Sequence, residues 1–342
     1  TGTCAAAAAQ AAATLLCRHQ AVDSVDVSLP GGQIVRLPIA FVRATADGAT
    51  AGVVKDAGDD PDVTNGSTVA VAVRRQSEGD EVFLAGEGVG MVTKPGLQIP
   101  PGEPAVNPAP RRMIRDAIRQ VTSDPMAVTI SIPGGRELAE KTFNPRLGIT
   151  GGLSILGTTG IVRPRCVKAL RDALSCALDV ATACRVTAPV LVPGNIGAKA
   201  ARARFALSPE QLIEVSNEWG WILDQVRSRD FSALLVVGHP GKLAKLANGE
   251  WDTHSSRSHS AVLFVRGLAE AHGQDLPSPH ETVEGLFESL SPSARSDLGA
   301  ALASRVRDAI ETRLTRRLPA PVLLVNMRGE ELGSSGDFEP WA

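Results

Sequence analysis

The stretch that decides the fold is APVLVPGNIGAKAARARF, residues 188–205. It begins with a short, wholly apolar run, which is typical of a strand buried on both faces of a sheet. The run ends in PGNIG, residues 193–197, and a basic, helix-like segment follows. The stretch therefore predicts a buried strand, a glycine loop and a helix, in that order.

A second stretch repeats this pattern. In SALLVVGHPGKLAKLANG, residues 232–249, an apolar run leads into GHPG, residues 238–241, and then into a helix with Lys242 and Lys245. A third apolar run lies in APVLLVNMRG, residues 320–329. With helices expected over 166–184 and 208–228, the three runs predict a parallel sheet covered by helices on both faces.

The two glycine loops are candidates for a ligand site. Glycine lets the backbone approach a ligand, the following helix offers free N–H groups, and α/β sheets bind ligands at the carboxyl ends of their strands. Neither loop has the G-x-G-x-x-G or G-x-x-x-x-G-K-[ST] spacing of a nucleotide site. Each loop alone could be an ordinary turn, but the repetition favours a small anionic or polar cofactor. The residues predicted to bind it are Gly194, Asn195, Gly197, Gly238, His239, Gly241 and Lys242.

The first part of the chain has a different pattern. After an alanine-rich helix, expected from Cys4 to Leu16 with Thr3 as its N-cap, residues 25–56 alternate apolar and polar around Gly-Gly and Asp-Gly turns, which predicts antiparallel hairpins. Six prolines between Pro95 and Pro110 predict an extended segment, and a helix over 113–121 and a strand over 126–133 follow. We therefore predict two domains, an α+β antiparallel-sheet domain over 1–150 and an α/β domain with a mainly parallel sheet over 151–342.

Composition excludes several classes of function. The chain has 342 residues, 43% of them hydrophobic, and a formal net charge of −2, so it has no general attraction for nucleic acid or an anionic membrane. No signal peptide or membrane-spanning run is recognisable, and the five cysteines have neither C-x-x-C nor metal-ligand spacing. These features predict a cytoplasmic protein with reduced thiols and no metal site of its own.

Three polar or glycine-rich stretches leave alternatives open. KDAGDDPDVTNG, residues 55–66, is either a solvated turn or a carboxylate cluster acting as base or cation ligand. WDTHSSRSH, residues 251–259, offers Asp252, His254 and His259, which are more typical of loop hydrogen bonds than of a catalytic set. FNPRLGITGGLSILGTTGIVRP, residues 143–164, is too apolar for a tether and too rich in glycine for a well-packed element. Trp219 and Trp221 are expected in the core of the second domain.

Five stretches together resemble the cobalt-precorrin-5B C1-methyltransferase family, or CbiD family, of the anaerobic cobalamin pathway. They occur in the order of the family, and each is long and unusual. The resemblance runs from the first residue to about Ser255. The five are TGTCAAAAAQAA (1–12), KDAGDDPDVTNG (55–66), GVGMVTKPGLQIPPGEPAVNPAPRRMI (88–114), FNPRLGITGGLSILGTTGIVRP (143–164) and VVGHPGKLAKLANGEWDTHS (236–255).

The resemblance implies a Rossmann-like second domain and methyl transfer from S-adenosylmethionine to C1 of cobalt-precorrin-5B, giving cobalt-precorrin-6A. Cobalt would enter only as part of this tetrapyrrole substrate. Because a sulfonium methyl is already activated, few catalytic side chains are needed. The catalytic residue stays unknown, with Asp60 and His239 as candidates.

A tetrapyrrole with many carboxylates needs Arg, Lys and N–H donors against an apolar floor. Each arginine near the family motifs could equally be an ordinary surface charge. The glycine segment 148–160 could line a cleft between the domains and become ordered with ligand, or it could be a rigid buried crossover. The substrate-binding candidates are Arg111, Arg112, Arg146, Gly151, Gly152, Thr158, Thr159 and Arg163, with Arg165 beside them.

Two other functions remain compatible with the sequence. One is a tetrapyrrole-binding protein without transferase activity, and the other is an α/β enzyme that uses the glycine loops for a nucleotide. Neither nucleic acid nor a membrane is expected as a partner, and assembly into a homo-oligomer is left open.

Overall fold

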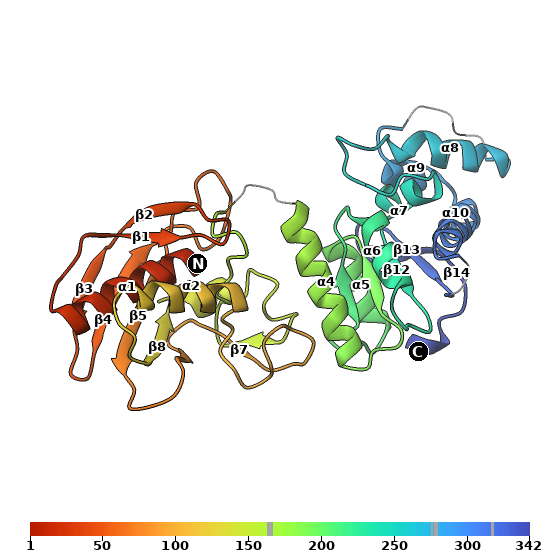
Figure 1. Ribbon diagram of the computed structural model, residues 1–342. Coiled ribbons are helices and arrows are strands. Elements are labelled where there is room, and N and C mark those ends of the chain that lie inside the picture. Colours follow the sequence, from red (N-terminus) through yellow and green to blue (C-terminus); the bar gives the residue numbers. More distant parts are fainter. Residues whose placement is uncertain (163–166, 275, 277–279, 316–317) are drawn as a thin grey trace. The chain divides into compact units, whose positions relative to one another are not determined.

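The computed structural model describes residues 1–162, 167–274, 276, 280–315 and 318–342. The chain divides into two compact units, Thr1–Val167 and Lys168–Ala342 (Figure 1). The structure keeps residues 151–162 with the first unit, whereas the sequence analysis assigned them to the second. The reason is packing, because Leu153 and Ile155 belong to the buried core of the first unit.

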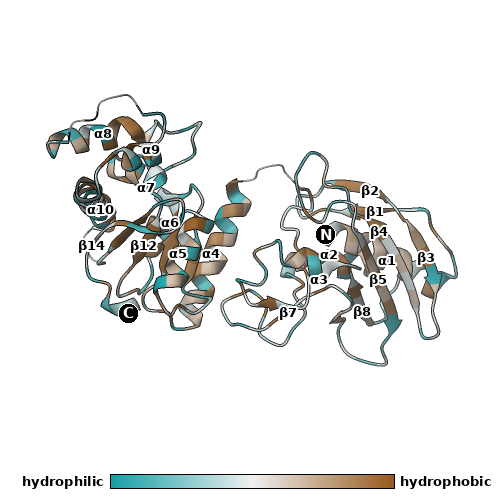
Figure 2. Ribbon diagram, turned by 180° about the vertical axis from the view of Figure 1, so that it is seen from behind, coloured by the Kyte–Doolittle hydropathy of each residue, from teal (hydrophilic) through white to brown (hydrophobic). Residues whose placement is uncertain are grey.

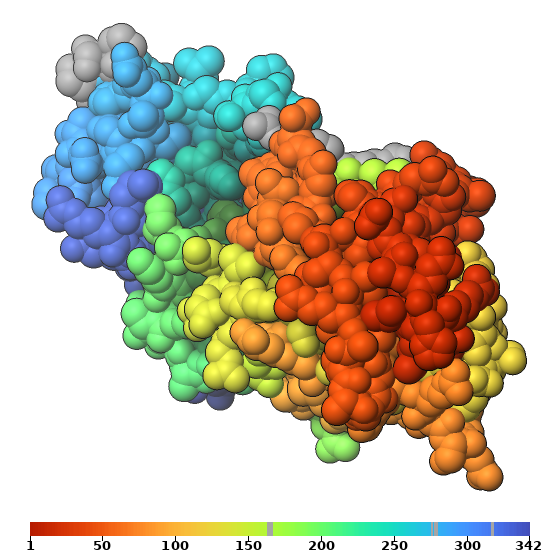
Figure 3. All heavy atoms as spheres, turned by 90° about the vertical axis from the view of Figure 1, so that its left-hand side faces the viewer, coloured from red at the N-terminus to blue at the C-terminus, as the bar shows by residue number. Residues whose placement is uncertain are grey.

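The first unit is built on a five-stranded sheet with the order β3-β4-β5-β8-β6. The predicted antiparallel pairing is confirmed for β3, β4, β5 and β8, whereas β6 runs parallel to β8. A separate hairpin, β1–β2, and a short pair, β7–β9, complete the strands. Red and orange residues of the N-terminal part make up much of the face of this unit that Figure 3 presents, with yellow residues beside them. The strands are β1 (Ser24–Ser28), β2 (Ile34–Pro38), β3 (Phe41–Ala44), β4 (Ala49–Val54), β5 (Thr68–Arg75), β6 (Val82–Ala85), β7 (Met91–Val92), β8 (Met126–Ser131) and β9 (Ile149–Thr150).

Helix α1 (Gly2–Arg18) is the buried centre of the first unit. It packs against β4, β5 and α2, and its alanines from Ala5 to Ala9 are 0% exposed. Alanine has the highest helix propensity and a side chain short enough for the helix to lie close to the sheet. The helix was predicted, but its N-cap is Thr1 and not Thr3. Thr3 lies inside the first turn, where its hydroxyl donates to the carbonyl of Gly160 at 2.6 Å.

Helix α2 (Pro108–Arg119) begins inside the proline-rich stretch, earlier than predicted. Its first residue is Pro108, and a second proline, Pro110, lies in the same turn. Proline is tolerated there because the first N–H groups of a helix have no acceptor within the helix. A short helix, α3 (Gly135–Ala139), follows β8.

The second unit has a sheet with the order β11-β10-β12-β13-β14. The first four strands are mutually parallel and β14 is antiparallel to β13, which confirms the predicted mainly parallel sheet. β12 is hydrophobic along its length in Figure 2, and hydrophilic residues gather in the helices and loops around the sheet. The strands are β10 (Val190–Val192), β11 (Leu212–Glu214), β12 (Leu235–Gly238), β13 (Val322–Val325) and β14 (Glu331–Ser335).

Helices cover both faces of this sheet. One buried cluster joins α5 with Val190 and Val192, and a larger one joins all the other α-helices of the unit with the opposite face, where Leu191 lies. The unit is therefore three-layered, as the apolar strands predict. The helices are α4 (Val167–Ala183), α5 (Asn195–Arg204), α6 (Trp219–Arg227), α7 (Pro240–Ala247), α8 (Ala261–Ala271), α9 (Val283–Ser289) and α10 (Pro292–Arg313), followed by the 3₁₀ turn η1 (Glu339–Trp341).

The helix predicted over residues 208–228 is wrong in its first half. Residues 212–214 form strand β11, and α6 begins only at Trp219. The adjacent apolar residues Leu212 and Ile213 pair with β10. A short apolar run is compatible with a helix or a strand, and here the neighbouring strand decides for the strand. Trp219 is fully buried and Trp221 packs against the same cluster, as expected.

No helix among the described residues is long and apolar enough to cross a membrane.

We predict that Gly152→Ala destabilises the first unit. A Cβ on Gly152 would overlap the backbone of Gly88, and such overpacking costs about 1–3 kcal/mol. Gly31→Ala is the matched control, because nothing lies within 4 Å of the added atom. Urea unfolding measures both variants. Equal free energies of unfolding for the two would contradict the close packing described here.

Candidate functional site

The two predicted glycine loops lie side by side in the second unit. β10 and β12 are adjacent parallel strands, but β10 leads to α5 on one face of the sheet and β12 leads to α7 on the other. A crevice forms at the carboxyl ends of such strands, where the direction of the connections reverses, and α/β proteins bind ligands there. The loops touch, since a Cβ on Gly238 would lie 2.6 Å from Cδ of Pro193.

The glycines of these loops have different roles. A Cβ on Gly197 would overlap the carbonyl oxygen of Val237, and one on Gly238 would meet Pro193, so both glycines allow close packing. No atom of the described residues lies within 4 Å of a Cβ built on Gly194. Gly194 is therefore the position where backbone is open to a ligand. Asn195 follows it as the first residue of α5.

The start of α5 also offers hydrogen-bond donors. Its N-cap residue, Gly194, has no side chain to accept from the first N–H groups. Helix α7 differs, because the Nδ1 atom of His239 accepts from the N–H of Gly241 at 3.0 Å, and the carbonyl of His239 accepts from Lys242 and Leu243. The donors available to a polar ligand are thus those of α5.

His239 is held from both ring nitrogens. Because Nδ1 accepts from Gly241, Nε2 carries the proton and donates to Oε2 of Glu284 at 2.8 Å. The other oxygen of Glu284 accepts from the backbone N–H of Met327 at 3.1 Å. Glu284, in the first turn of α9, therefore links the loops after β12 and β13. The imidazole, a catalytic candidate from sequence, acts in this structure as a cap and a brace.

Two lysines follow on α7. Lys245 is buried and donates to the hydroxyl of Ser258 at 2.7 Å and to the carbonyl of Thr253. Burial, helped by the nearby charge of Lys245, lowers the pKa of Lys242. No acceptor contacts the ammonium group of Lys242 in the part of the chain that the structure describes. Lys242 can therefore offer its charge to an anion.

The loop over residues 251–259 consists of local hydrogen bonds, as predicted. Asp252 pairs with Arg257 and accepts from the N–H of His254. The ring of His254 contacts Ser256, and the exposed ring of His259 pairs with Glu250. These groups are occupied by their neighbours in the loop.

In the first unit, the segment 143–162 connects the other family motifs. Its residue Leu153 exchanges backbone hydrogen bonds with Gly88 and Gly90, and Ile155 with Ala105 and Asn107. At its far end, the hydroxyl of Thr1 donates to the carbonyl of Leu156. The buried Asn144 braces the turn internally, donating to Gly152 and accepting from Ser154. Gly152 is thus a packing residue, whereas Gly151 is exposed.

The predicted substrate arginines lie in different environments. Arg111 donates to the carbonyls of Val106 and Pro104 and pairs with Glu103 at 2.7 Å, so it braces the proline-rich segment. Arg112 is exposed on α2, and exposed Arg146 lies over the ring of Phe143. Arg163 and Arg165 lie outside the described residues.

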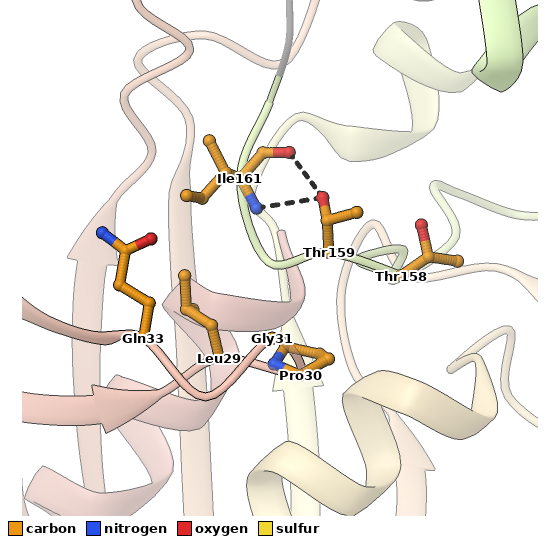
Figure 4. Close-up of a pocket in the computed structure, with 7 residues that line it drawn as sticks. All are labelled: Leu29, Pro30, Gly31, Gln33, Thr158, Thr159 and Ile161. Carbon is orange, nitrogen blue, oxygen red and sulfur yellow. Dashed lines mark hydrogen bonds between the residues drawn. The ribbon is translucent and has the colours of Figure 1, made fainter.

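A pocket of about 390 Å³ opens beside this segment. Figure 4 shows the side chains of Leu29 and Ile161 near one another, with Thr158 and Thr159 along the rim. The hydroxyl of Thr159 donates to the carbonyl of Ile161 at 3.0 Å, which folds the loop back on itself. Ile161 is 47% exposed, an unusual exposure for a large apolar side chain. The pocket is thus lined by apolar side chains, among them Leu29 and Ile161, and by the two threonines.

Sequence reasoning missed one wall of this pocket. Residues 29–33 contribute Leu29, Pro30, Gly31 and Gln33. The Gly-Gly pair there predicted a hairpin turn, and the turn is present between β1 and β2. This turn lies near Thr159 because of the way the β1–β2 hairpin packs in the first unit. No local sequence pattern predicts that packing. Glu284 was missed for the same reason.

The acidic loop 55–66 is organised around a buried ion pair. Lys55 is 3% exposed and pairs with Asp62 at 2.6 Å. Asp62 also accepts from the N–H and the hydroxyl of Thr64. Asp60, the second catalytic candidate, is half-buried, and its N–H donates to Ala57. Of the two interpretations, the contacts favour a structured turn at Asp62, with Asp56 closing an Asx turn on Gly58.

No group of three or more His, Cys, Asp or Glu that could hold a metal ion occurs among the described residues. Cys4, Cys17, Cys176 and Cys184 are free thiols, and only Cys4 is buried.

Fold and site define the class of protein, an α+β unit joined to a Rossmann-like unit with two glycine loops at its switch point. Comparison with known proteins identifies the family. The sequence profile of CbiD matches residues 1–164. The chain belongs to the CbiD family.

Its relatives match along nearly their whole length. A cobalt-precorrin-5B C(1)-methyltransferase from Syntrophotalea carbinolica is 51% identical over 100% of this chain and 97% of the relative. Proteins with the same name from Moorella thermoacetica and Methanocaldococcus jannaschii are 40% and 38% identical, covering 97% and 98% of this chain and 93% and 94% of the relatives. A crystal structure of the cobalamin biosynthesis protein CbiD from Archaeoglobus fulgidus is 31% identical, covers 75% of this chain and 80% of that chain, and has a TM-score of 0.41.

The ion pair in the acidic loop leads to a prediction about pH. Burial raises the pKa of Asp62, but hydrogen bonds from Lys55 and Thr64 outweigh it and hold the pKa below its ordinary value. A carboxyl with a depressed folded-state pKa stabilises the fold above its unfolded pKa of about 3.9, and this contribution is lost as the pH falls through the folded-state value. The free energy of unfolding should therefore decrease below about pH 4.

Asp62→Asn should flatten this dependence and, by leaving Lys55 unpaired, should lower stability at neutral pH by about 3 kcal/mol. Chemical unfolding between pH 2 and pH 7 measures both effects. Asp59→Asn, in the exposed part of the same loop, is the control. A slope for Asp62→Asn equal to that of the wild type would show that the pair does not govern acid stability.

Proposed function

We propose that this chain transfers a methyl group from S-adenosylmethionine to C1 of cobalt-precorrin-5B, giving cobalt-precorrin-6A. The observation that carries the proposal is 51% identity, over the whole chain, to a relative named for this C1 methylation. The fold is compatible with it, because a small polar donor can lie at the crevice between β10 and β12. Cobalt belongs to the substrate.

The residues at the crevice fit the donor. Gly194 leaves open the space that a side chain would fill, and the first N–H groups of α5 are free of a side-chain cap. Lys242 is a half-buried cation without a protein acceptor among the described residues, which suits the carboxylate of an amino acid. Gly197 and Gly238 act indirectly, by allowing the loops to pack. His239 and Glu284 fix the second loop.

We assign the tetrapyrrole to the first unit. The pocket beside Thr158 and Thr159 joins apolar side chains, of which Ile161 is exposed and Leu29 is buried, to threonine hydroxyls, and this combination suits a flat macrocycle with polar substituents. Arg112 and Arg146, both exposed, can meet its carboxylates, and Gly151 leaves its backbone accessible. Arg111 acts behind them by holding the proline-rich segment.

Little catalysis by side chains is needed. S-adenosylmethionine supplies a methyl group already activated by its sulfonium, and an electron-rich ring carbon attacks it while the sulfur leaves with the electron pair of the broken bond. The protein orients the two molecules and excludes water. No general base is assigned, because both ring nitrogens of His239 are engaged.

The proposal predicts that the purified protein, given S-adenosylmethionine and cobalt-precorrin-5B without oxygen, adds one methyl group at C1. Mass spectrometry detects the gain, and NMR of product made with a ¹³C-labelled methyl locates it. A folded protein that binds the tetrapyrrole but adds no methyl would favour the inactive carrier. Stabilisation by a nucleotide and not by S-adenosylhomocysteine would favour the nucleotide enzyme.

Gly194→Val should weaken donor binding without unfolding the protein. The backbone at Gly194 is extended, with φ of 165°, and the added Cβ has no described atom within 4 Å, so we expect the new side chain to project into the space proposed for the ligand. We expect the Kd of S-adenosylhomocysteine to rise about tenfold or more, or about 1.4 kcal/mol. Calorimetry measures it. Gly267→Val on α8, where the new Cβ is equally free of contacts, is the control. Unchanged affinity in Gly194→Val would move the donor away from this loop.

A further inference from the structure

Glu214 has a special place in the second unit. It is the last residue of β11 and lies opposite Val192, the last residue of β10, in the parallel ladder. β10 then continues directly into Pro193 and Gly194. Since neighbouring strands lie about 4.8 Å apart, Glu214 is at the same height as the open glycine loop and one strand away.

The alternation along β11 tells on which face Glu214 lies. Leu212 belongs to the buried cluster on the α5 side, and Ile213 belongs to the cluster on the opposite side. Side chains alternate along a strand, so Glu214 shares the face of Leu212 and α5. Leu212 and Ile213 are buried but Glu214 is only half-buried. Its carboxylate therefore lies at the rim of the sheet, on the side where α5 begins.

Two other carboxylates near the ends of these strands connect elements away from the loop of Gly194. The buried Glu218, after β11, pairs with Arg171 at 2.8 Å. Glu284 uses one oxygen for His239 and the other for the N–H of Met327. Glu214 is the acidic residue next to the loop of Gly194.

We infer that Glu214 binds the ribose of the adenosyl donor, its carboxylate accepting hydrogen bonds from the two ribose hydroxyls. In βαβ units that bind nucleosides, an acidic residue at the end of the second strand, about 20 residues after the glycine loop, accepts from the ribose. Here the order is β10, Gly194, α5, β11, Glu214, with that spacing. The inference rests on the proposed function.

The assignment orients the donor across the sheet. Its adenosyl end lies over β11 and β10, and its amino-acid end extends toward the loop after β12. Lys242, at the start of α7, then faces the carboxylate of the amino acid. Opposite charges at the two ends of the crevice match a ligand with a diol at one end and a carboxylate at the other.

The test combines a variant with a modified ligand. Calorimetry measures S-adenosylhomocysteine and its 2′-deoxy and 3′-deoxy analogues on the wild type and on Glu214→Gln. Hydrogen bonds to a charged group predict that Glu214→Gln weakens S-adenosylhomocysteine about tenfold to a hundredfold. At least one deoxy analogue should bind the wild type about tenfold more weakly, and this penalty should fall to about twofold in the variant.

Two further variants exclude a general effect of charge or folding. Glu210→Gln removes one negative charge near the amino end of β11, the end away from Glu214. This variant should bind S-adenosylhomocysteine with the affinity of the wild type. Glu214→Asp keeps the carboxylate and should regain part of the discrimination between ribose and deoxyribose. Thermal melts confirm that the variants are folded.

The outcomes separate the inference from the proposed function. Suppose that the wild type binds S-adenosylhomocysteine and that the Kd of Glu214→Gln is within twofold of the wild-type value. The role of Glu214 is then overturned and the proposed function stands. The same conclusion follows if removal of a ribose hydroxyl weakens binding to Glu214→Gln as much as it weakens binding to the wild type. If the wild type binds no S-adenosylhomocysteine, both are overturned.

Discussion

Close contact between backbones is the constraint on which both units depend. In the first unit, the segment 143–162 lies so near the turn that follows β6 that Gly152 and Gly88 have no room for a side chain between them. In the second, Gly197 lies against the carbonyl of Val237, and Gly299 of α10 lies against β14 at Gly333. The all-alanine face of α1 has the same effect on the first sheet. Close approach of two backbones strengthens the dispersion contacts and hydrogen bonds between them. An added side-chain carbon would push the backbones apart and weaken both.

The same absence of side chains has a different effect at the two glycine loops of the second unit. At Gly197 and Gly238 the missing side chain is replaced by protein atoms, which sets the distance between the loops after β10 and β12. At Gly194 no atom of the described residues lies within 4 Å of the added Cβ. Two packing glycines thus hold the loops together, and the third leaves its backbone uncovered by them. His239 and Glu284 add stiffness, because their hydrogen bonds connect the second loop to α9 and to the turn after β13.

Sequence patterns predicted the parts of the fold that depend on local periodicity. Apolar runs identified β10, β12 and β13, and the glycine loops after two of them are adjacent in the structure. Short elements that depend on partners were missed, since β11 has only three residues and forms because β10 lies beside it. For the site, sequence alone could not separate Gly194 from Gly238, because the distinction lies in what surrounds each Cβ position. Arg111 was likewise predicted from sequence to bind the substrate. In the structure its guanidinium donates to the backbone carbonyls of Val106 and Pro104.

The chemistry of methyl transfer explains why so few side chains stand out. A reaction whose electrophile is already activated depends on alignment and on the exclusion of water, and backbone held by packing is suited to both. Charged residues then have secondary tasks, such as Arg111 bracing a loop and Glu284 fixing a histidine. In a protein of this kind, the residues nearest to the reacting atoms need not be acidic, basic or nucleophilic. Such residues are identified from the packing of the backbone and not from the chemistry of their side chains.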